Sequence, residues 1–178
     1  DPNAFIRPSP SGGSLGGVAE KTREAMLVSE AAGFDVIVVE TVGVGQSETT
    51  VAGMVDAFVL LQLPNAGDDL QAIKKGIVEI ADLVVINKAD IDPKAAQFAK
   101  HQFENALGLL RSTSAHWRPK VLTLSAQTGE GIAGFWQEIE RHRKTLQESG
   151  ELEDKRRRQA LDWMWTLIDA ELRNRFRH

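Results

Sequence analysis

The 178-residue chain contains no cysteine, and its four histidines lie far apart in the sequence. The absence of cysteine excludes disulfides and thiolate metal sites, and no two histidines have the spacing that would ligate a metal from one helical turn. No apolar run approaches the roughly 20 residues that cross a bilayer, and the first ten residues, DPNAFIRPSP, lack the basic-then-apolar layout of a signal peptide. These absences predict a soluble protein without a membrane segment.

Acidic residues slightly outnumber basic ones, 25 to 21, so the chain has a net charge of −4. Nothing in this overall balance attracts a polyanion, and nucleic acid is therefore not an expected partner. The one strongly basic run, from Lys155 to Arg158, is surrounded by acidic residues in a helical stretch. This pattern favours a solvated, salt-bridged helix face, and the alternative is contact with a partner.

Short apolar runs alternate with helical segments along a chain whose length suits one domain. The apolar runs are residues 34–39, 57–63, 82–86 and 120–124. Each has the length of a strand that is buried on both faces. Helical periodicity marks residues 18–32, 70–81, 95–110, 131–147 and 151–176. The alternation predicts an α/β fold in which helices flank a parallel sheet.

A polar segment follows each of the four apolar runs, and three of these segments contain glycine. They are residues 40–43, 64–69, 87–90 and 125–131. In an open parallel sheet, ligands bind outside the carboxyl ends of the strands, where loops converge and helix N-termini present free N–H groups. The sequence therefore predicts a ligand site at this edge of the sheet.

The segment Asn87-Lys88-Ala89-Asp90 contains the residue types that read guanine. The Asp90 carboxylate can accept hydrogen bonds from the N1–H and the exocyclic amine of guanine, which adenine does not supply. The alkyl stem of Lys88 can cover the base plane, and Asn87 can brace a neighbouring loop or touch the ring. The alternative is an ordinary strand-to-helix turn, in which Asp90 or Asp92 caps a helix that begins at residue 93.

Ser125-Ala126 follows the last apolar run and can present backbone amides to the guanine oxygen. The signal is weak on its own, because the Thr-Gly-Glu-Gly that comes next is also ordinary turn chemistry.

Glu40 follows the first apolar run and precedes two glycines. In a nucleoside-triphosphate site, a carboxylate at a strand end holds Mg²⁺, usually through a water molecule, and a following glycine lets its N–H approach the γ-phosphate. Glu40 and Gly43 have this spacing, with Thr41 and Val42 between them. The alternative is that Glu40 caps a helix beginning near Ser47 and that the glycines only turn the chain.

The order Glu-x-x-Gly, Asn-Lys-x-Asp, Ser-Ala resembles that of P-loop GTPases, and longer segments resemble one family in particular. These segments are residues 4–10, 15–17, 40–48, 67–76 and 87–90. Together they resemble the MeaB/ArgK/MMAA family, G-protein chaperones of adenosylcobalamin-dependent methylmalonyl-CoA mutase. The resemblance covers nearly the whole chain, as far as Trp163-Met164-Trp165.

The resemblance implies a GTPase that gates adenosylcobalamin delivery to the mutase and protects that enzyme, with GTP or GDP and Mg²⁺ as ligands. It assigns guanine contacts to Asn87, Lys88, Asp90, Ser125 and Ala126. It assigns γ-phosphate and switch contacts to Glu40, Thr41, Val42 and Gly43, with Glu40 also at the metal. Many GTPases carry aspartate where Glu40 stands, which makes its metal contact less direct.

The resemblance also implies a loop that signals the nucleotide state to the mutase. Its residues are Gly67, Asp68, Asp69, Gln71, Lys74 and Lys75. For Asp68 and Asp69, favourable charge at a helix N-terminus is an equally good explanation. The closing helix is rich in large apolar residues, which implies a homodimer contact as in the family, or simply a buried terminal helix. The implied location is the cytoplasm, or the mitochondrial matrix in a eukaryote.

The 178 residues contain no Gly-x-x-x-x-Gly-Lys-Ser/Thr, the loop that cradles the β- and γ-phosphates. In the family this loop precedes the matching segment, so we expect residues 1–148 to be a partial GTPase domain and residues 149–178 a C-terminal helix of a chain cut at both ends. Such a chain is expected to bind nucleotide weakly and to hydrolyse it hardly at all. Two alternatives stay open: a kinase or ATPase linked to basic amino-acid transport, and a non-catalytic scaffold or dimerisation module.

Overall fold

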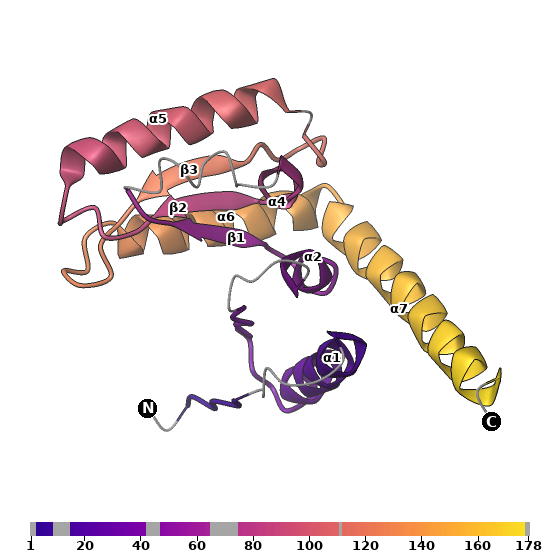
Figure 1. Cartoon of the computed structure of the whole chain (residues 1–178). Coiled ribbons are helices and arrows are strands. Elements are labelled where there is room, and N and C mark those ends of the chain that lie inside the picture. Colours follow the sequence, from indigo (N-terminus) through magenta and orange to yellow (C-terminus); the bar gives the residue numbers. More distant parts are fainter. Residues whose placement is uncertain (1–2, 9–14, 42–46, 65–74, 111, 177–178) are drawn as a thin grey trace. The chain divides into compact units, whose positions relative to one another are not determined.

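The computed structural model describes residues 3–8, 15–41, 47–64, 75–110 and 112–176. The chain divides into two compact units, Asp1–Met54 and Val55–His178, and each is described here by itself (Figure 1).

The first unit contains two helices, α1 (Leu15–Ala31) and α2 (Ser47–Ala52), which contact each other. Helix α1 ends where the sequence predicts, because the chain turns at Gly33 with a φ of 92° and the Gly33 amide donates to the Glu30 carbonyl at 3.0 Å. The side chain of Arg7, which precedes α1, donates to the carbonyl of Lys21 at 3.4 Å.

The prediction of a strand at residues 34–39 is wrong for this structure. The run forms no strand, and the side chains of Val36 and Val38 are 48% and 85% exposed. A strand satisfies its backbone N–H and C=O groups by pairing with a neighbouring strand. No strand of the described residues pairs with this run, so its β-branched composition is not enough to produce one.

The second unit is built on a parallel sheet of three strands in the order β1-β2-β3. The strands are β1 (Val59–Gln62), β2 (Leu83–Ile86) and β3 (Lys120–Thr123). Leu83 of the central strand pairs with Val59 on one side and with Lys120 on the other. The other three predicted strands and their parallel arrangement are therefore confirmed.

The helices that the described residues of this unit form are α4 (Lys75–Ile80), α5 (Pro93–Leu109), α6 (Ile132–Glu148) and α7 (Glu151–Phe176). Figure 1 shows α5 and α6 on opposite sides of the sheet. All four residues of β2 are fully buried, as expected for a central strand covered on both faces. Ala96, Ala99 and Phe103 are the buried residues of α5, whereas Leu146 of α6 packs with Leu83 and Trp117.

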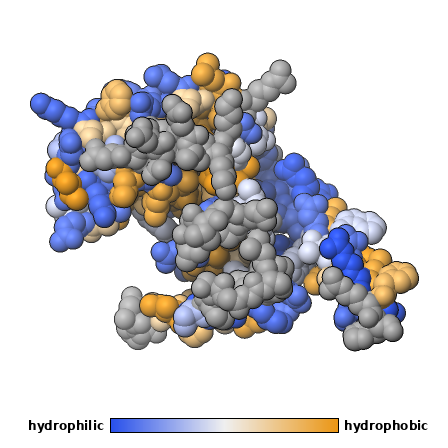
Figure 2. Space-filling model, in the orientation of Figure 1, coloured by the Kyte–Doolittle hydropathy of each residue, from blue (hydrophilic) through white to orange (hydrophobic). Residues whose placement is uncertain are grey.

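Helix α7 begins after a turn at Gly150 and has two different halves. Its first turns pack near α6, where Leu152 joins the cluster around Leu83 and Leu146. From Leu161 onward the helix keeps large apolar side chains on the surface, which Figure 2 shows as apolar patches toward the end of the helix. They are Leu161, Met164, Trp165, Leu167, Ile168, Leu172 and Phe176. Among the described helices, none combines the length and the apolarity that crossing a membrane requires.

Candidate functional site

The loops after β2 and β3 begin side by side at the carboxyl edge of the sheet. The ladder continues past both strands, because the Leu124 amide donates to the Ile86 carbonyl at 3.0 Å and the Asn87 amide donates to the Gln62 carbonyl at 2.8 Å. Parallel pairing thus brings Asn87 and Ser125, which are 38 positions apart in the chain, to the start of two neighbouring loops.

The side chain of Asn87 connects these two loops. Its Oδ1 accepts hydrogen bonds from the Lys88 amide at 2.7 Å and from the Ala126 amide at 3.1 Å. The Ala89 amide also donates to the Leu124 carbonyl at 3.1 Å. Of the two roles that the sequence leaves open for Asn87, this structure displays the bracing of a neighbouring loop.

Lys88 has a φ of 59°, and within the described ranges it is the only residue other than glycine with a positive φ. This left-handed conformation is unfavourable for a residue with a long side chain and requires support from its surroundings. Here the side-chain oxygen of Asn87, Oδ1, accepts a hydrogen bond from the Lys88 amide and stabilises the turn. The turn leaves the Lys88 side chain exposed at the edge of the sheet.

The cap of α5 is Asp92, not Asp90. The Asp92 carboxylate accepts from the Ala95 amide at 2.9 Å, and Pro93 occupies the first helical position. Asp90 is exposed, and no hydrogen bond or ion pair to its carboxylate occurs among the described residues. The helix-cap alternative therefore holds for Asp92 and leaves the Asp90 carboxylate available to a ligand.

The loop after β3 folds tightly around Ser125, which is only 1% exposed. The Ser125 amide donates to the Glu130 carbonyl at 2.9 Å, and the Ser125 carbonyl accepts from the Gly129 amide at 2.9 Å. Its hydroxyl oxygen accepts from the Thr128 amide at 3.1 Å. The Ser125 amide is thus occupied within its own loop, whereas the amide of Ala126, an exposed residue, donates to Asn87 Oδ1 in the neighbouring loop.

The remaining predicted site residues do not belong to these two loops. Glu40 is exposed and Thr41 is half-buried, both in the first unit, whereas Val42 and Gly43 lie outside the described residues. The partner-signalling residues Gly67, Asp68, Asp69, Gln71 and Lys74 also lie outside them, and Lys75 is the first residue of α4. Within the described ranges no three acidic or histidine side chains cluster as a metal site.

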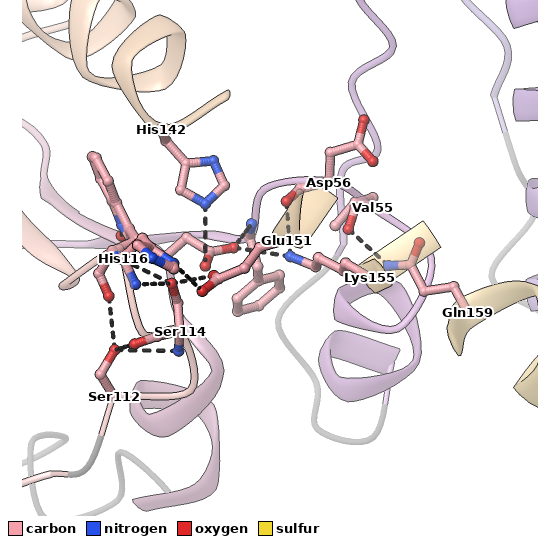
Figure 3. Close-up of polar contacts among 12 residues, drawn as sticks. Val55, Asp56, Ser112, Ser114, His116, His142, Glu151, Lys155 and Gln159 are labelled. Carbon is pink, nitrogen blue, oxygen red and sulfur yellow. Dashed lines mark hydrogen bonds and ion pairs between the residues drawn. The ribbon is translucent and has the colours of Figure 1, made fainter. Parts of the chain in front are cut away.

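A second polar cluster, at the amino ends of β1 and β2, escapes sequence analysis. We call it the amino-end cluster; it consists of Asp56, Asp82, His142 and Lys155 (Figure 3). The Asp82 carboxylate accepts from the Phe58 amide at 2.9 Å and from Lys155 Nζ at 3.3 Å, and His142 Nε2 lies 3.4 Å from its other oxygen. Lys155 Nζ also donates to the Asp56 carbonyl at 2.7 Å.

Electrostatics at the amino-end cluster favour the ionised carboxylates. Burial raises the pKa of Asp82, but the His142 imidazole, the Lys155 ammonium and the Phe58 amide outweigh it and hold that pKa below its ordinary value. The Arg156 guanidinium binds Asp56 through two nitrogens, at 2.8 and 2.6 Å, and lowers the pKa of Asp56. The basic run 155–158 is thus a salt-bridged face, as predicted, although Lys155 is largely buried.

A parallel sheet whose carboxyl edge carries Asn-Lys-x-Asp and Ser-Ala loops in direct contact defines the class of the protein as an α/β fold of the P-loop GTPase type, here without the phosphate loop itself. The family described as "Methylmalonyl Co-A mutase-associated GTPase MeaB" matches residues 1–178, and the chain belongs to this family.

Several proteins of known sequence resemble the chain closely. It is 54% identical over 175 residues to a "Putative GTPase" of Caulobacter vibrioides, covering 98% of this chain and 54% of that protein. It is 50% identical over 172 residues to "GTPase ArgK" of Escherichia coli, covering 96% and 52%. It is also 50% identical over 178 residues to "Methylmalonic aciduria type A homolog, mitochondrial" of Mus musculus, covering 99% and 43%.

A solved structure confirms the fold. The "Crystal structure of LAO/AO transport system kinase" matches with a TM-score of 0.85 at 45% identity, over 96% of this chain and 53% of that chain. The chain therefore spans about half the length of the relatives that it matches.

Proposed function

We propose that the chain is the guanine-reading part of a GTPase that gates adenosylcobalamin delivery to a methylmalonyl-CoA mutase and protects that enzyme. One observation carries the guanine assignment: the hydrogen bond from the Ala126 amide to Asn87 Oδ1, which joins the Asn-Lys-x-Asp loop to the Ser-Ala loop at neighbouring strand ends. Membership of a family named for mutase-associated GTPases supports the wider role.

In the proposed complex, each exposed group at the carboxyl edge has a separate task. Asp90 accepts from the N1–H and the exocyclic amine of guanine, and the alkyl stem of Lys88 lies across the base. The Ala126 N–H, which donates to Asn87 Oδ1 in this structure, is shared in the complex between Asn87 Oδ1 and the guanine oxygen, and Ser125 holds the loop that carries it. Adenine presents an amine where guanine has its oxygen, so the same groups reject it.

The phosphate end of the nucleotide requires more than this chain contains. We assign the γ-phosphate to residues 40–43, with Glu40 holding Mg²⁺ through a water molecule. The β-phosphate is then held by a glycine-rich loop from a segment of the same polypeptide outside these 178 residues, in accord with the greater length of the relatives.

Partner contacts complete the proposal. Residues 67–75 transmit the nucleotide state to the mutase, and the exposed apolar side chains of α7 meet a second copy of the chain in a homodimer. In a bacterium such a complex works in the cytoplasm. In a eukaryote it works in the mitochondrial matrix, in accord with the word "mitochondrial" in the name of the mouse relative.

Asp90→Asn in the full-length protein tests the guanine assignment. Asparagine cannot accept from both the N1–H and the exocyclic amine, so GDP affinity should fall by roughly 10- to 100-fold, the loss of a charge-assisted pair. Xanthosine diphosphate, which carries a carbonyl where guanine has its amine, should gain affinity because the new amide donates to it. Asp92→Asn is the matched control, since Asp92 caps α5 and should leave base preference unchanged. Unchanged GDP binding by Asp90→Asn contradicts the assignment.

The 178 residues alone test the missing phosphate loop. Because they lack the backbone cradle for the phosphates, we expect calorimetric titration to give no GDP affinity tighter than roughly micromolar. Nanomolar binding would show that residues within the chain grip the phosphates and that the loop is not needed.

A second candidate function is a kinase linked to basic amino-acid transport, which the similar solved structure, described as a "LAO/AO transport system kinase", favours. Capture of a mutase by the full-length protein separates the two. The GTPase role requires capture that differs between a non-hydrolysable GTP analogue and GDP. Transfer of phosphate to a transport protein, without nucleotide-dependent capture, supports the kinase. A scaffold without catalysis predicts capture that is indifferent to nucleotide.

A further inference from the structure

We infer that Gly131 is a positioning residue for guanine recognition, because the absence of a side chain at this position lets the Ser125-Ala126 loop close against the end of β3. The inference rests on the proposed function and adds to it a residue that has no assigned contact with the nucleotide.

Gly131 lies where the chain leaves the loop and enters α6, and its backbone passes very close to β3. A Cβ atom at this position would lie 2.6 Å from the Thr123 carbonyl oxygen, 3.0 Å from Leu124 Cβ and 3.1 Å from Leu124 Cα. These distances are shorter than van der Waals contact, and two of the three atoms belong to the backbone. A backbone atom cannot rotate aside as a side chain can, so a side chain at Gly131 has to push the loop and the strand end apart.

The end of β3 is joined by hydrogen bonds to the loops whose atoms would contact guanine. The Leu124 amide donates to the carbonyl of Ile86, the last residue of β2, at 3.0 Å, and the Leu124 carbonyl accepts from the Ala89 amide of the Asn-Lys-x-Asp loop at 3.1 Å. The next two residues are Ser125, whose amide bonds to the Glu130 carbonyl beside Gly131, and Ala126. A side chain at position 131 would displace Leu124, and one or two peptide units carry that displacement on to the Ala126 amide.

Alanine substitutions at two other glycines distinguish the effect of this collision from the effect of backbone strain. Gly129, in the same loop, has a φ of 83°, close to the 79° of Gly131, but a Cβ there meets nothing within 4 Å. Gly134, two residues inside α6, has neither a positive φ nor a neighbour within 4 Å. Alanine at 129 thus introduces strain alone, alanine at 131 introduces strain and collision, and alanine at 134 introduces neither.

The experiment compares Gly131→Ala with Gly129→Ala and Gly134→Ala in the full-length protein, by titration with three diphosphates. GDP measures overall affinity, 6-thio-GDP replaces the guanine oxygen that the Ala126 amide would contact, and IDP lacks the amine that Asp90 would contact. Thermal melting confirms that each variant is folded.

We expect Gly131→Ala to lose roughly three- to tenfold in GDP affinity relative to Gly129→Ala, the worth of one neutral hydrogen bond. Its preference for GDP over 6-thio-GDP should shrink, while its preference for GDP over IDP should change least. A merely structural effect would lower all three affinities alike. Gly129→Ala and Gly134→Ala should keep the preferences of the unaltered protein.

Each other outcome has a definite meaning. Failure of the unaltered full-length protein to bind GDP overturns the proposed function itself, whereas GDP binding with unchanged preferences in Gly131→Ala overturns only the role of Gly131. If Gly131→Ala does not fold, Gly131→Asn replaces it, because asparagine tolerates a positive φ but retains the colliding Cβ. If that variant also fails to fold while Gly129→Asn folds, Gly131 serves the stability of the fold and the inference is wrong.

Discussion

The two ends of the central sheet carry polar groups of opposite character. At the carboxyl edge, Lys88 and Asp90 are exposed, and Asp90 has no partner among the described residues. At the amino edge, Asp82 is largely buried and is engaged by Phe58 and Lys155. Polar groups without partners at the carboxyl edge agree with the ligand site proposed there, whereas the engaged groups at the amino edge stabilise the fold.

The largest expected difference between the two edges is in the free energy of unfolding when the carboxylate at each edge is removed in turn. Asp82→Ala leaves the Phe58 amide without its acceptor and Lys155 without its opposite charge, although Lys155 keeps the Asp56 carbonyl, so the free energy of unfolding should fall by about 3 kcal/mol. Asp90→Ala should change it by less than about 0.5 kcal/mol, because Asp90 is exposed. Urea unfolding of both variants measures the contrast. Equal losses would show that the two edges do not differ in this way.

Acid should affect stability through the amino edge. The pKa of Asp82 is lowered in the folded protein, so on acidification the unfolded chain binds protons first. The stabilisation from the ionised carboxylate is complete above the unfolded pKa of about 4 and is lost as pH falls through the lower folded pKa. Urea midpoints between pH 6 and pH 3 should therefore decline below about pH 4. The decline should be shallower in Asp82→Asn, and an equally steep decline would exclude Asp82 as its source.

The smallest expected effect concerns the ion pair between Arg156 and Asp56, at the exposed edge of the amino-end cluster. Arg156 binds Asp56 through two nitrogens, but both side chains are more than one-third exposed, and solvent screens their attraction. Arg156→Ala should therefore cost only about 0.5 kcal/mol in urea unfolding at low salt, and less at high salt. If Arg156→Ala lowered the free energy of unfolding as much as Asp82→Ala, the difference in burial between the Asp82–Lys155 pair and the Asp56–Arg156 pair would not determine their contributions.

Local patterns predicted the helices well. The boundary at Gly33, the break at Ser149-Gly150 and the long last helix follow from glycine chemistry and periodicity, and the structure confirms them. The same local reasoning offered two caps for α5, and only the geometry selected Asp92. The capping preference is the same for both aspartates, and the path of the chain decides which one reaches the Ala95 amide.

The two β-branched runs at 34–39 and 83–86 show where local reasoning ends. Both have strand composition, but residues 83–86 pair on both sides and are fully buried, whereas residues 34–39 pair with no described strand. The difference lies in neighbours, because the hydrogen bonds of a strand come from another part of the chain.

By itself, the sequence determined the family of the protein and most of its helices, and it named the candidate residues for guanine contact, because motifs and periodicity act over a few neighbouring positions. Only the tertiary structure decided that Asn87 holds Ala126, that Gly131 passes against Thr123, and that Asp82 meets Lys155. These contacts join residues that lie from 8 to 73 positions apart in the chain. Their formation depends on the parallel register of the sheet and on how closely its loops and helices pack, which no short segment of sequence contains.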